Sequence, residues 1–258
     1  MTVRRGQQLR VKAALVTGYL PFGAYPDNPT RRVTKTLGER GAIEGIRGKE
    51  FIQVFSLILP NQYDTHETVM QRIREIRREC GLSQEEPLVV VSGGLSTSIR
   101  AVSLEAVGWN EIDSKYATQD GVLINDGRAI VSDASDGYQT NVDSVSLMLN
   151  LAAVRVPSVT SADAGRFTCN SITFGMFHLL HVEGERTLFQ FYHSGLTETD
   201  SRLELPSDVR EPYAAGIKIF HPDKWLEIGV PVMVRGLARQ AEALAQDEWK
   251  NPIPISKK

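Results

Sequence analysis

The sequence has few cysteines and no excess of one charge. Its two cysteines among 258 residues, Cys80 and Cys169, lie far apart without C-x-x-C spacing. This indicates neither a disulfide framework nor a zinc ribbon, so we expect two free thiols. The 29 basic and 31 acidic residues leave a formal net charge of -2, with no long block of one sign. We therefore expect no nucleic-acid partner and no membrane partner, and favour peptide or small-molecule chemistry.

Long apolar runs and low-complexity linkers are also missing. Near the N-terminus only the short run AALV is apolar, which is too short for a signal peptide or a membrane span. We therefore expect a cytoplasmic protein. No composition shift suggests a boundary, so we expect a single domain over residues 1–258, with loose ends at 1–10 and 251–258.

Short apolar runs alternate with segments of helical period. The clearest strand is LVVV within residues 86–94, because four consecutive apolar residues are typical of a strand covered on both faces. Further strands are predicted at 12–18, 51–60 and 187–195, and helices at 30–40, 64–80 and 230–250, the last amphipathic. The alternation predicts an α/β fold: a single-domain three-layer α/β/α sandwich with a mostly parallel, twisted central sheet. Ligands of such folds bind at the carboxyl ends of the strands.

Cys169 lies where the segment SADAGRFTCNSITFGMFHLLH (161–181) turns into a predicted amphipathic helix. If that helix begins near Asn170, its free N–H groups and its dipole favour an anion and lower a thiol pKa. A thiolate hydrolase also needs a histidine to manage the proton and a polar group to orient it. By position, His193 at a predicted strand end is the best histidine, and Glu105 is a candidate for the orienting group.

The same residues also have purely structural interpretations. An isolated cysteine is most often a buried apolar side chain, and we keep that interpretation for Cys80. His193 is equally compatible with a half-exposed strand histidine, and Glu105 with a solvated surface acid. His178 and His181 are spaced as a metal-ligand pair, but no third ligand follows at convincing spacing, so we expect no metal site.

Four blocks of the sequence together resemble one known family. They are LVTGYLPFGAYPDNP (15–29), SLEAVGWNEIDSK (103–115), DAGRFTCNSITFGMFH (163–178) and FQFYHSG (189–195). In order and spacing they are similar to the opening, glutamate, nucleophile and histidine motifs of the pyroglutamyl peptidase I family, the pyrrolidone carboxyl peptidases. The resemblance extends from about residue 11 to about residue 246 and is weakest between 116 and 160.

The resemblance implies a cysteine peptidase, an omega peptidase, that removes N-terminal pyroglutamate from peptides through an acyl-enzyme and without a cofactor. It implies Cys169 as nucleophile, His193 as general base and then acid, and Glu105 as the group that holds the imidazole. It also implies peptide substrates as partners and leaves a homo-oligomer open. The substrate-binding residues that it implies are Tyr19, Phe22, Asn28, Leu95, Lys115, Phe167 and Thr168.

The chain departs from the family pattern at two places. Where the family usually has G-Q-A-G-G-R, this chain has GGLSTSIR, which puts Leu95 at the glutamine position. Lys115 stands where the family has an arginine, and it keeps the charge but not the planar fork. Two alternatives therefore stay open: a different cysteine-dependent hydrolase of small amides or a nucleoside-handling enzyme, and a noncatalytic binding relative on the same scaffold.

Overall fold

The computed structural model describes residues 9–21, 27–46, 48, 50–96, 99, 101–195 and 222–256, and the side chains of the last range from residue 226. A seven-stranded sheet forms its centre, in the order β2-β3-β1-β4-β9-β5-β8. Four of its pairings are parallel, whereas β2 runs antiparallel to β3 and β5 runs antiparallel to β9. The predicted mostly parallel sheet is confirmed. The strands are β1 (Ala13–Tyr19), β2 (Ala42–Glu44), β3 (Phe51–Leu59), β4 (Leu88–Leu95), β5 (Val102–Glu105), β8 (Ser158–Ser161) and β9 (Thr187–Ser194).

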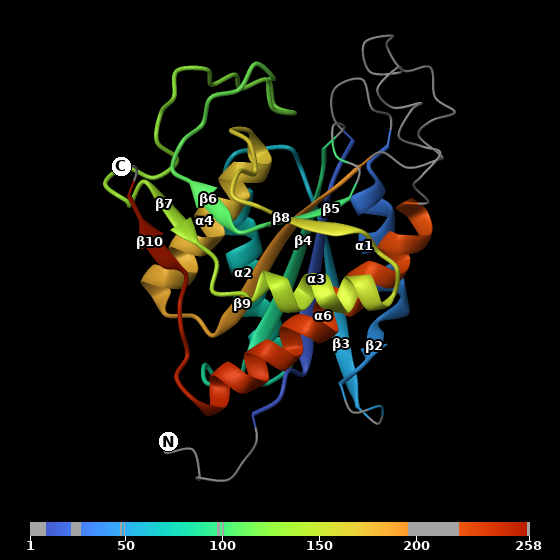
Figure 1. Cartoon of the computed structure of the whole chain (residues 1–258). Helices are drawn as coiled ribbons and strands as arrows, with labels where there is room; N and C mark the ends of the chain where they lie inside the picture. The colour runs from blue at the N-terminus through green and yellow to red at the C-terminus, as the bar shows by residue number, and fades with distance from the viewer. Residues whose placement is uncertain are drawn as a thin grey trace.

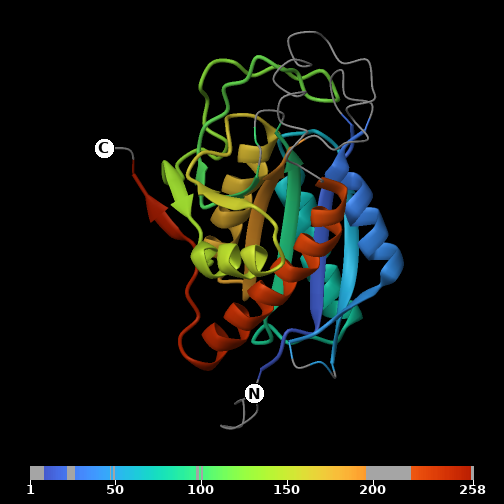
Figure 2. The same cartoon turned by 45° about the vertical axis from the view of Figure 1, so that its right-hand side comes forward.

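Helices cover both faces of this sheet. One face packs against α1 (Pro29–Arg40), α3 (Ser144–Ala153) and α6 (Pro222–Gln246), and the other against α2 (Thr65–Glu79) and α4 (Thr168–Glu183). Figure 1 shows α3 and α6 in front of the strands, and Figure 2 shows α1 and α6 along them from a second direction. Successive residues of β1 alternate between the two apolar clusters, because side chains of a strand point to opposite faces in turn. The result is the expected α/β/α sandwich.

Local sequence explains where the first helix begins and ends. Asn28 caps α1, since its side-chain oxygen accepts the Thr30 N–H, and Pro29 occupies the first turn without losing a hydrogen bond. Gly41 ends the helix with a φ of 70°, a conformation that costs glycine little. The closing helix α6 begins at Pro222, earlier than the predicted residue 230, ends at Gln246 and contains Pro231.

A second, small sheet lies outside α4 and was not predicted. It pairs β6 (Val107–Trp109), β7 (Gly137–Gln139) and β10 (Ile253–Ile255) in antiparallel fashion. Each strand has three residues, too few to show a periodic pattern. Figure 1 shows this sheet beside α4. The expectation of a loose end at 251–258 is therefore wrong for residues 253–255, which pair with β7.

The helix α4 differs from the predicted amphipathic helix. Its residues from Asn170 to Phe177 are all buried, because the small sheet covers the side that faces away from the main sheet. Gly108 of β6 makes this contact very close: a Cβ atom there would lie 2.5 Å from the Phe174 backbone nitrogen. The first turns of α4 are thus fixed between two sheets. Within the described residues, no helix has the length and apolarity needed to cross a membrane.

Candidate active site

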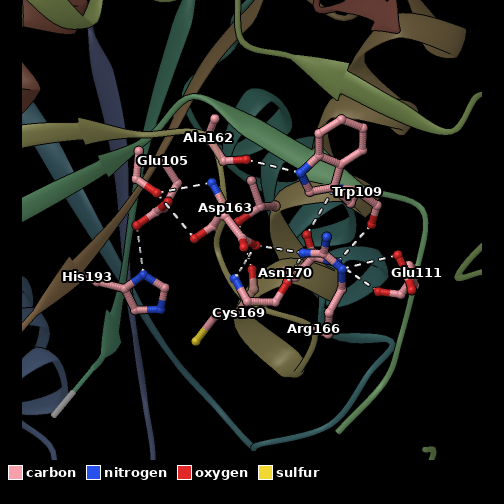
Figure 3. A network of polar contacts seen from close by, with 12 residues as sticks. Glu105, Trp109, Glu111, Ala162, Asp163, Arg166, Cys169, Asn170 and His193 are labelled. Carbon is pink, nitrogen blue, oxygen red and sulfur yellow. Dashed lines mark hydrogen bonds and ion pairs between the residues drawn. The ribbon is translucent and has the colours of Figure 1, made fainter. Parts of the chain in front are cut away.

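Three elements bring Glu105, Cys169 and His193 together near the carboxyl end of β9, an interior strand of the main sheet. Glu105 is the last residue of β5, His193 lies near the end of β9, and Cys169 is the second residue of α4. In the antiparallel β5–β9 pair, Glu105 stands opposite Phe191, two residues before His193. Residues two apart on a strand share a face, so the carboxylate and the imidazole both point to the α4 side. Figure 3 shows the three side chains around this point.

Glu105 holds the imidazole of His193. The Nδ1 atom of His193 lies 2.9 Å from Oε1 of Glu105, and both side chains are buried, with exposed fractions of 10% and 2%. Phe191 packs edge-on against the His193 ring at a centroid distance of 5.1 Å. A buried carboxylate bound to Nδ1 fixes the ring's orientation and leaves Nε2 as the nitrogen for a second partner.

Cys169 is that second partner, and the pair is electrostatically coupled. Burial by itself lowers the pKa of the His193 imidazole, but the negative charge of the Cys169 thiolate, its hydrogen bond to the ring, and Glu105 outweigh burial and raise that pKa to about 10. The raised pKa favours the protonated form of the His193 ring. The arrangement places a proton-carrying imidazole within hydrogen-bonding reach of the Cys169 sulfur.

A glycine makes room for the sulfur. Gly94 of β4 stands beside His193 in the parallel β4–β9 register. A Cβ atom at Gly94 would lie 2.9 Å from the sulfur of Cys169 and 2.7 Å from the Phe191 ring, closer than real Cβ contacts. A side chain at this position would therefore displace either the thiol or the ring that supports His193.

Hydrogen bonds join the segment after Glu105 to the segment before Cys169. The Ala106 N–H donates to the Ser161 carbonyl at 2.7 Å, and the indole N–H of Trp109 donates to the Ala162 carbonyl at 3.0 Å. These two bonds carry the β5–β8 pairing onward past the ends of both strands.

A further connection joins the same segments closer to Cys169. The Arg166 guanidinium binds Glu111 at 3.2 Å and Asp163 at 2.6 Å, as Figure 3 shows. The two segments that carry Glu105 and Cys169 therefore run side by side.

Three of the predicted substrate residues, Tyr19, Asn28 and Leu95, are buried, and a fourth lies outside the described residues. Tyr19 is 1% exposed, its hydroxyl lies 3.2 Å from that of Thr65, and burial followed by the charge of Cys169 raises the pKa of its phenol. The Tyr19 ring is therefore within electrostatic range of Cys169, but almost none of its surface is exposed to a ligand. Asn28 is buried as the cap of α1, and Leu95 is buried at the end of β4. Phe22 lies outside the described residues.

The other predicted substrate residues lie next to the start of α4. Phe167 packs edge-on against Tyr63 at 5.8 Å and at a tilt against Tyr116 at 6.2 Å. Lys115 is exposed, with its ammonium 5.3 Å from the centre of the Tyr116 ring, and Thr168 is buried in the first turn of α4. These contacts form an aromatic group two residues from Cys169. A substrate role for all seven predicted residues stays a prediction.

The remaining cysteine and the histidine pair lie elsewhere. Cys80 ends α2, contacts Gln53 at 3.7 Å, and burial raises the pKa of its thiol, which disfavours a thiolate. His178 is 3.1 Å from the Tyr138 hydroxyl, and His181 is 2.9 Å from the Pro252 carbonyl. In the part of the chain that the structure describes, no three potential ligands converge as a metal site would require.

A half-buried thiol beside a histidine that a carboxylate orients, on an α/β scaffold, is the arrangement typical of cysteine hydrolases. Comparison with known families makes the class specific. Residues 12–201 match the family model described as pyroglutamyl peptidase, and the chain belongs to this family.

Individual relatives agree with the family match. The chain is 28% identical over 179 residues to a pyrrolidone-carboxylate peptidase of Pyrococcus furiosus, covering 69% of this chain and 78% of the relative. A pyrrolidone-carboxylate peptidase of Finegoldia magna is 24% identical over 222 residues, which are 85% of this chain and 92% of the relative.

A solved structure shows the same fold. The pyrrolidone carboxyl peptidase from Thermococcus litoralis superposes with a TM-score of 0.73 at 20% identity, covering 95% of this chain and all of that one. The family match and the fold predicted from the sequence are thus confirmed.

Proposed function

We propose that this chain hydrolyses the amide bond that follows an N-terminal pyroglutamyl residue, with Cys169 as nucleophile, His193 as acid and base, and Glu105 as the group that orients His193. The observation that carries the proposal is the position of His193, which binds Glu105 at 2.9 Å and is coupled to Cys169. The match of residues 12–201 to the pyroglutamyl peptidase family supports the substrate class.

The first half of the proposed reaction forms an acyl-enzyme. The thiolate of Cys169 attacks the scissile carbonyl carbon, and the new C–S bond pushes the carbonyl electrons onto oxygen. Backbone N–H groups in the first turn of α4 stabilise this oxyanion, since the start of a helix has donors without intrahelical partners. When the tetrahedral intermediate collapses, the His193 imidazolium gives its proton to the leaving nitrogen, and the C–N bond breaks.

The second half releases the acid. Neutral His193 takes a proton from a water molecule, whose oxygen attacks the thioester carbon, and the C–S bond breaks to return the thiolate. His193 is then an imidazolium again, which is the form that its raised pKa favours. Glu105 stabilises that cation throughout and does not itself need to change protonation state. The proposed steps use three side chains of this chain, backbone N–H groups of α4 and a water molecule.

The chemistry of pyroglutamate sets what the pocket must do. The lactam ring has no free amino group, so an ion pair cannot recognise it, and apolar walls with a few hydrogen bonds must do so. We propose that the aromatic side chain of Phe167, which lies two residues before Cys169 and packs against Tyr63, supplies such a wall.

The test compares three fluorogenic amides, carrying pyroglutamyl, prolyl and glutamyl groups. We expect hydrolysis of the pyroglutamyl amide, loss of that activity on alkylation of thiols, and no loss with a chelator. Cys169→Ser should lose nearly all activity, whereas the matched control Cys80→Ser should retain it. Equal losses in the two variants would mean that the nucleophile is wrongly assigned. Faster cleavage of another amide would favour a different cysteine-dependent amidase, and no thiol-dependent hydrolysis would favour a noncatalytic relative.

A further inference from the structure

The side chain of Asn170, the residue directly after Cys169, forms three hydrogen bonds to backbone groups. The side-chain oxygen of Asn170 accepts the Trp109 N–H at 2.9 Å, and its amide donates to the carbonyls of Trp109 at 2.8 Å and Glu111 at 2.9 Å. Asn170 is fully buried. An amide that uses both its acceptor and its two donors on backbone groups fixes one segment against another with little freedom.

The segment that Asn170 binds is the one that begins with the orienting carboxylate. Glu105 ends β5, and β6 follows at residues 107–109 after one intervening residue. Gly108 lies against the backbone of α4 at a distance that excludes any side chain. Asn170 therefore connects the start of α4, which carries Cys169, to the short stretch of chain that carries Glu105.

We propose that Asn170 is a positioning residue that sets the thiolate of Cys169 at hydrogen-bonding distance from the imidazole that Glu105 holds. The proposal deepens the proposed function and rests on it. Without the bonds of Asn170, the first turn of α4 can shift against β6, while Glu105 and His193 stay paired on their strands. The thiol then loses the imidazole with which it exchanges a proton, and its reactivity at weakly acidic pH falls.

A second asparagine provides a matched control. Asn110 also forms three side-chain bonds to backbone, since its oxygen accepts the N–H groups of Ile130 and Val131 and its amide donates to the Val131 carbonyl. Asn110 belongs to the same segment as Trp109 and Glu111. Its bonds, however, hold the loop at residues 130–131 and do not involve α4. Loss of its bonds should cost similar stability without moving Cys169.

The experiment uses full-length protein in a Cys80→Ser background, with Asn170→Ser, Asn170→Asp, Asn110→Ser and Asn110→Asp compared. Serine is small and uncharged, and aspartate keeps the acceptor but loses both donors. For each variant that unfolds cooperatively on heating, the rate at which a small uncharged alkylating agent modifies Cys169 is measured against pH. The kcat and KM for the pyroglutamyl amide are measured in parallel.

We expect both Asn170 variants to lose the alkylation that the parent retains at weakly acidic pH, by tenfold or more, and to lower kcat by about 10- to 100-fold with KM changed less than about threefold. Both Asn110 variants should keep the parent's profile. The proposal would be overturned if the pH profile of Cys169 alkylation were unchanged in the Asn170 variants, or changed only in Asn170→Asp. It would also be overturned if the Asn110 and Asn170 variants changed the profile equally. Because alkylation needs no substrate, a protein inactive on the amide still tests the role of Asn170 separately.

Discussion

At the scale of single residues, the site depends on one histidine with two charged neighbours. His193 is buried, which alone would favour the neutral ring, yet the charges of Cys169 and Glu105 hold a proton on it. Cys169 is the larger of these two influences, so the proton on the ring depends chiefly on the sulfur that the start of α4 places beside it.

Removing the thiolate should therefore lower the pKa of His193. In Cys169→Ser the charge and the thiolate hydrogen bond disappear while burial remains, so we expect a pKa well below the value of about 10 in the parent. Measurement is by NMR titration of the imidazole protons, with His193→Gln used to assign the resonance. The His193 ring would then lose its proton at lower pH than in the parent. A pKa that stays near 10 in Cys169→Ser would show that Glu105 alone holds the proton.

The sequence was sufficient to predict the three residues of this cluster, but not the neighbouring residues that hold them in position. Cys169, His193 and Glu105 follow from a helix start, a strand end and four motif blocks, and these are local features. Asn170 is adjacent to the nucleophile, yet its importance depends on carbonyls about 60 positions away, which no local pattern encodes. Likewise, the space that Gly94 leaves for the sulfur is visible only when β4 and α4 are brought together.

At the scale of elements, long periodic segments were predictable and short ones were not. The strands β1, β3, β4 and β9 and the helices α1 and α2 agree with prediction to within a few residues, because each has a continuous apolar pattern. The small sheet was missed, and α4 was predicted to be amphipathic because nothing local indicates that β6, β7 and β10 cover its outer side. Tertiary pairing of three-residue strands decides both features.

The C-terminal strand should consequently contribute to stability. Deleting residues 251–258 removes β10, its pairing with β7 and the Pro252 carbonyl that contacts His181. We expect the free energy of unfolding, measured in urea, to fall by roughly 1–3 kcal/mol, the value of a few net hydrogen bonds. The control is deletion of residues 257–258 alone, which leaves β10 intact. Equal urea midpoints for the two truncations would mean that β10 pairs without stabilising the fold.

At the scale of the whole molecule, the fold places Cys169 and His193 near the carboxyl ends of the central strands β4 and β9. The central strands are buried on both faces, so their sequences are continuous apolar runs. The three-layer architecture was predictable from these runs. A strand was predicted in the segment that begins at residue 103, but the antiparallel direction of β5, which brings Glu105 beside His193, was not. Its direction depends on the long-range pairing with β9, and a four-residue strand carries no signal of direction.

The most direct test of the central claim is to trap the acyl-enzyme. The protein is mixed with an excess of a pyroglutamyl ester, quenched in acid within the first turnovers, digested and examined by mass spectrometry. The account predicts one added pyroglutamyl group on the peptide that contains Cys169, and none on the peptide that contains Cys80. Steady hydrolysis of the ester with an unmodified Cys169, or with the group on another residue, would contradict the assignment of Cys169 as the nucleophile.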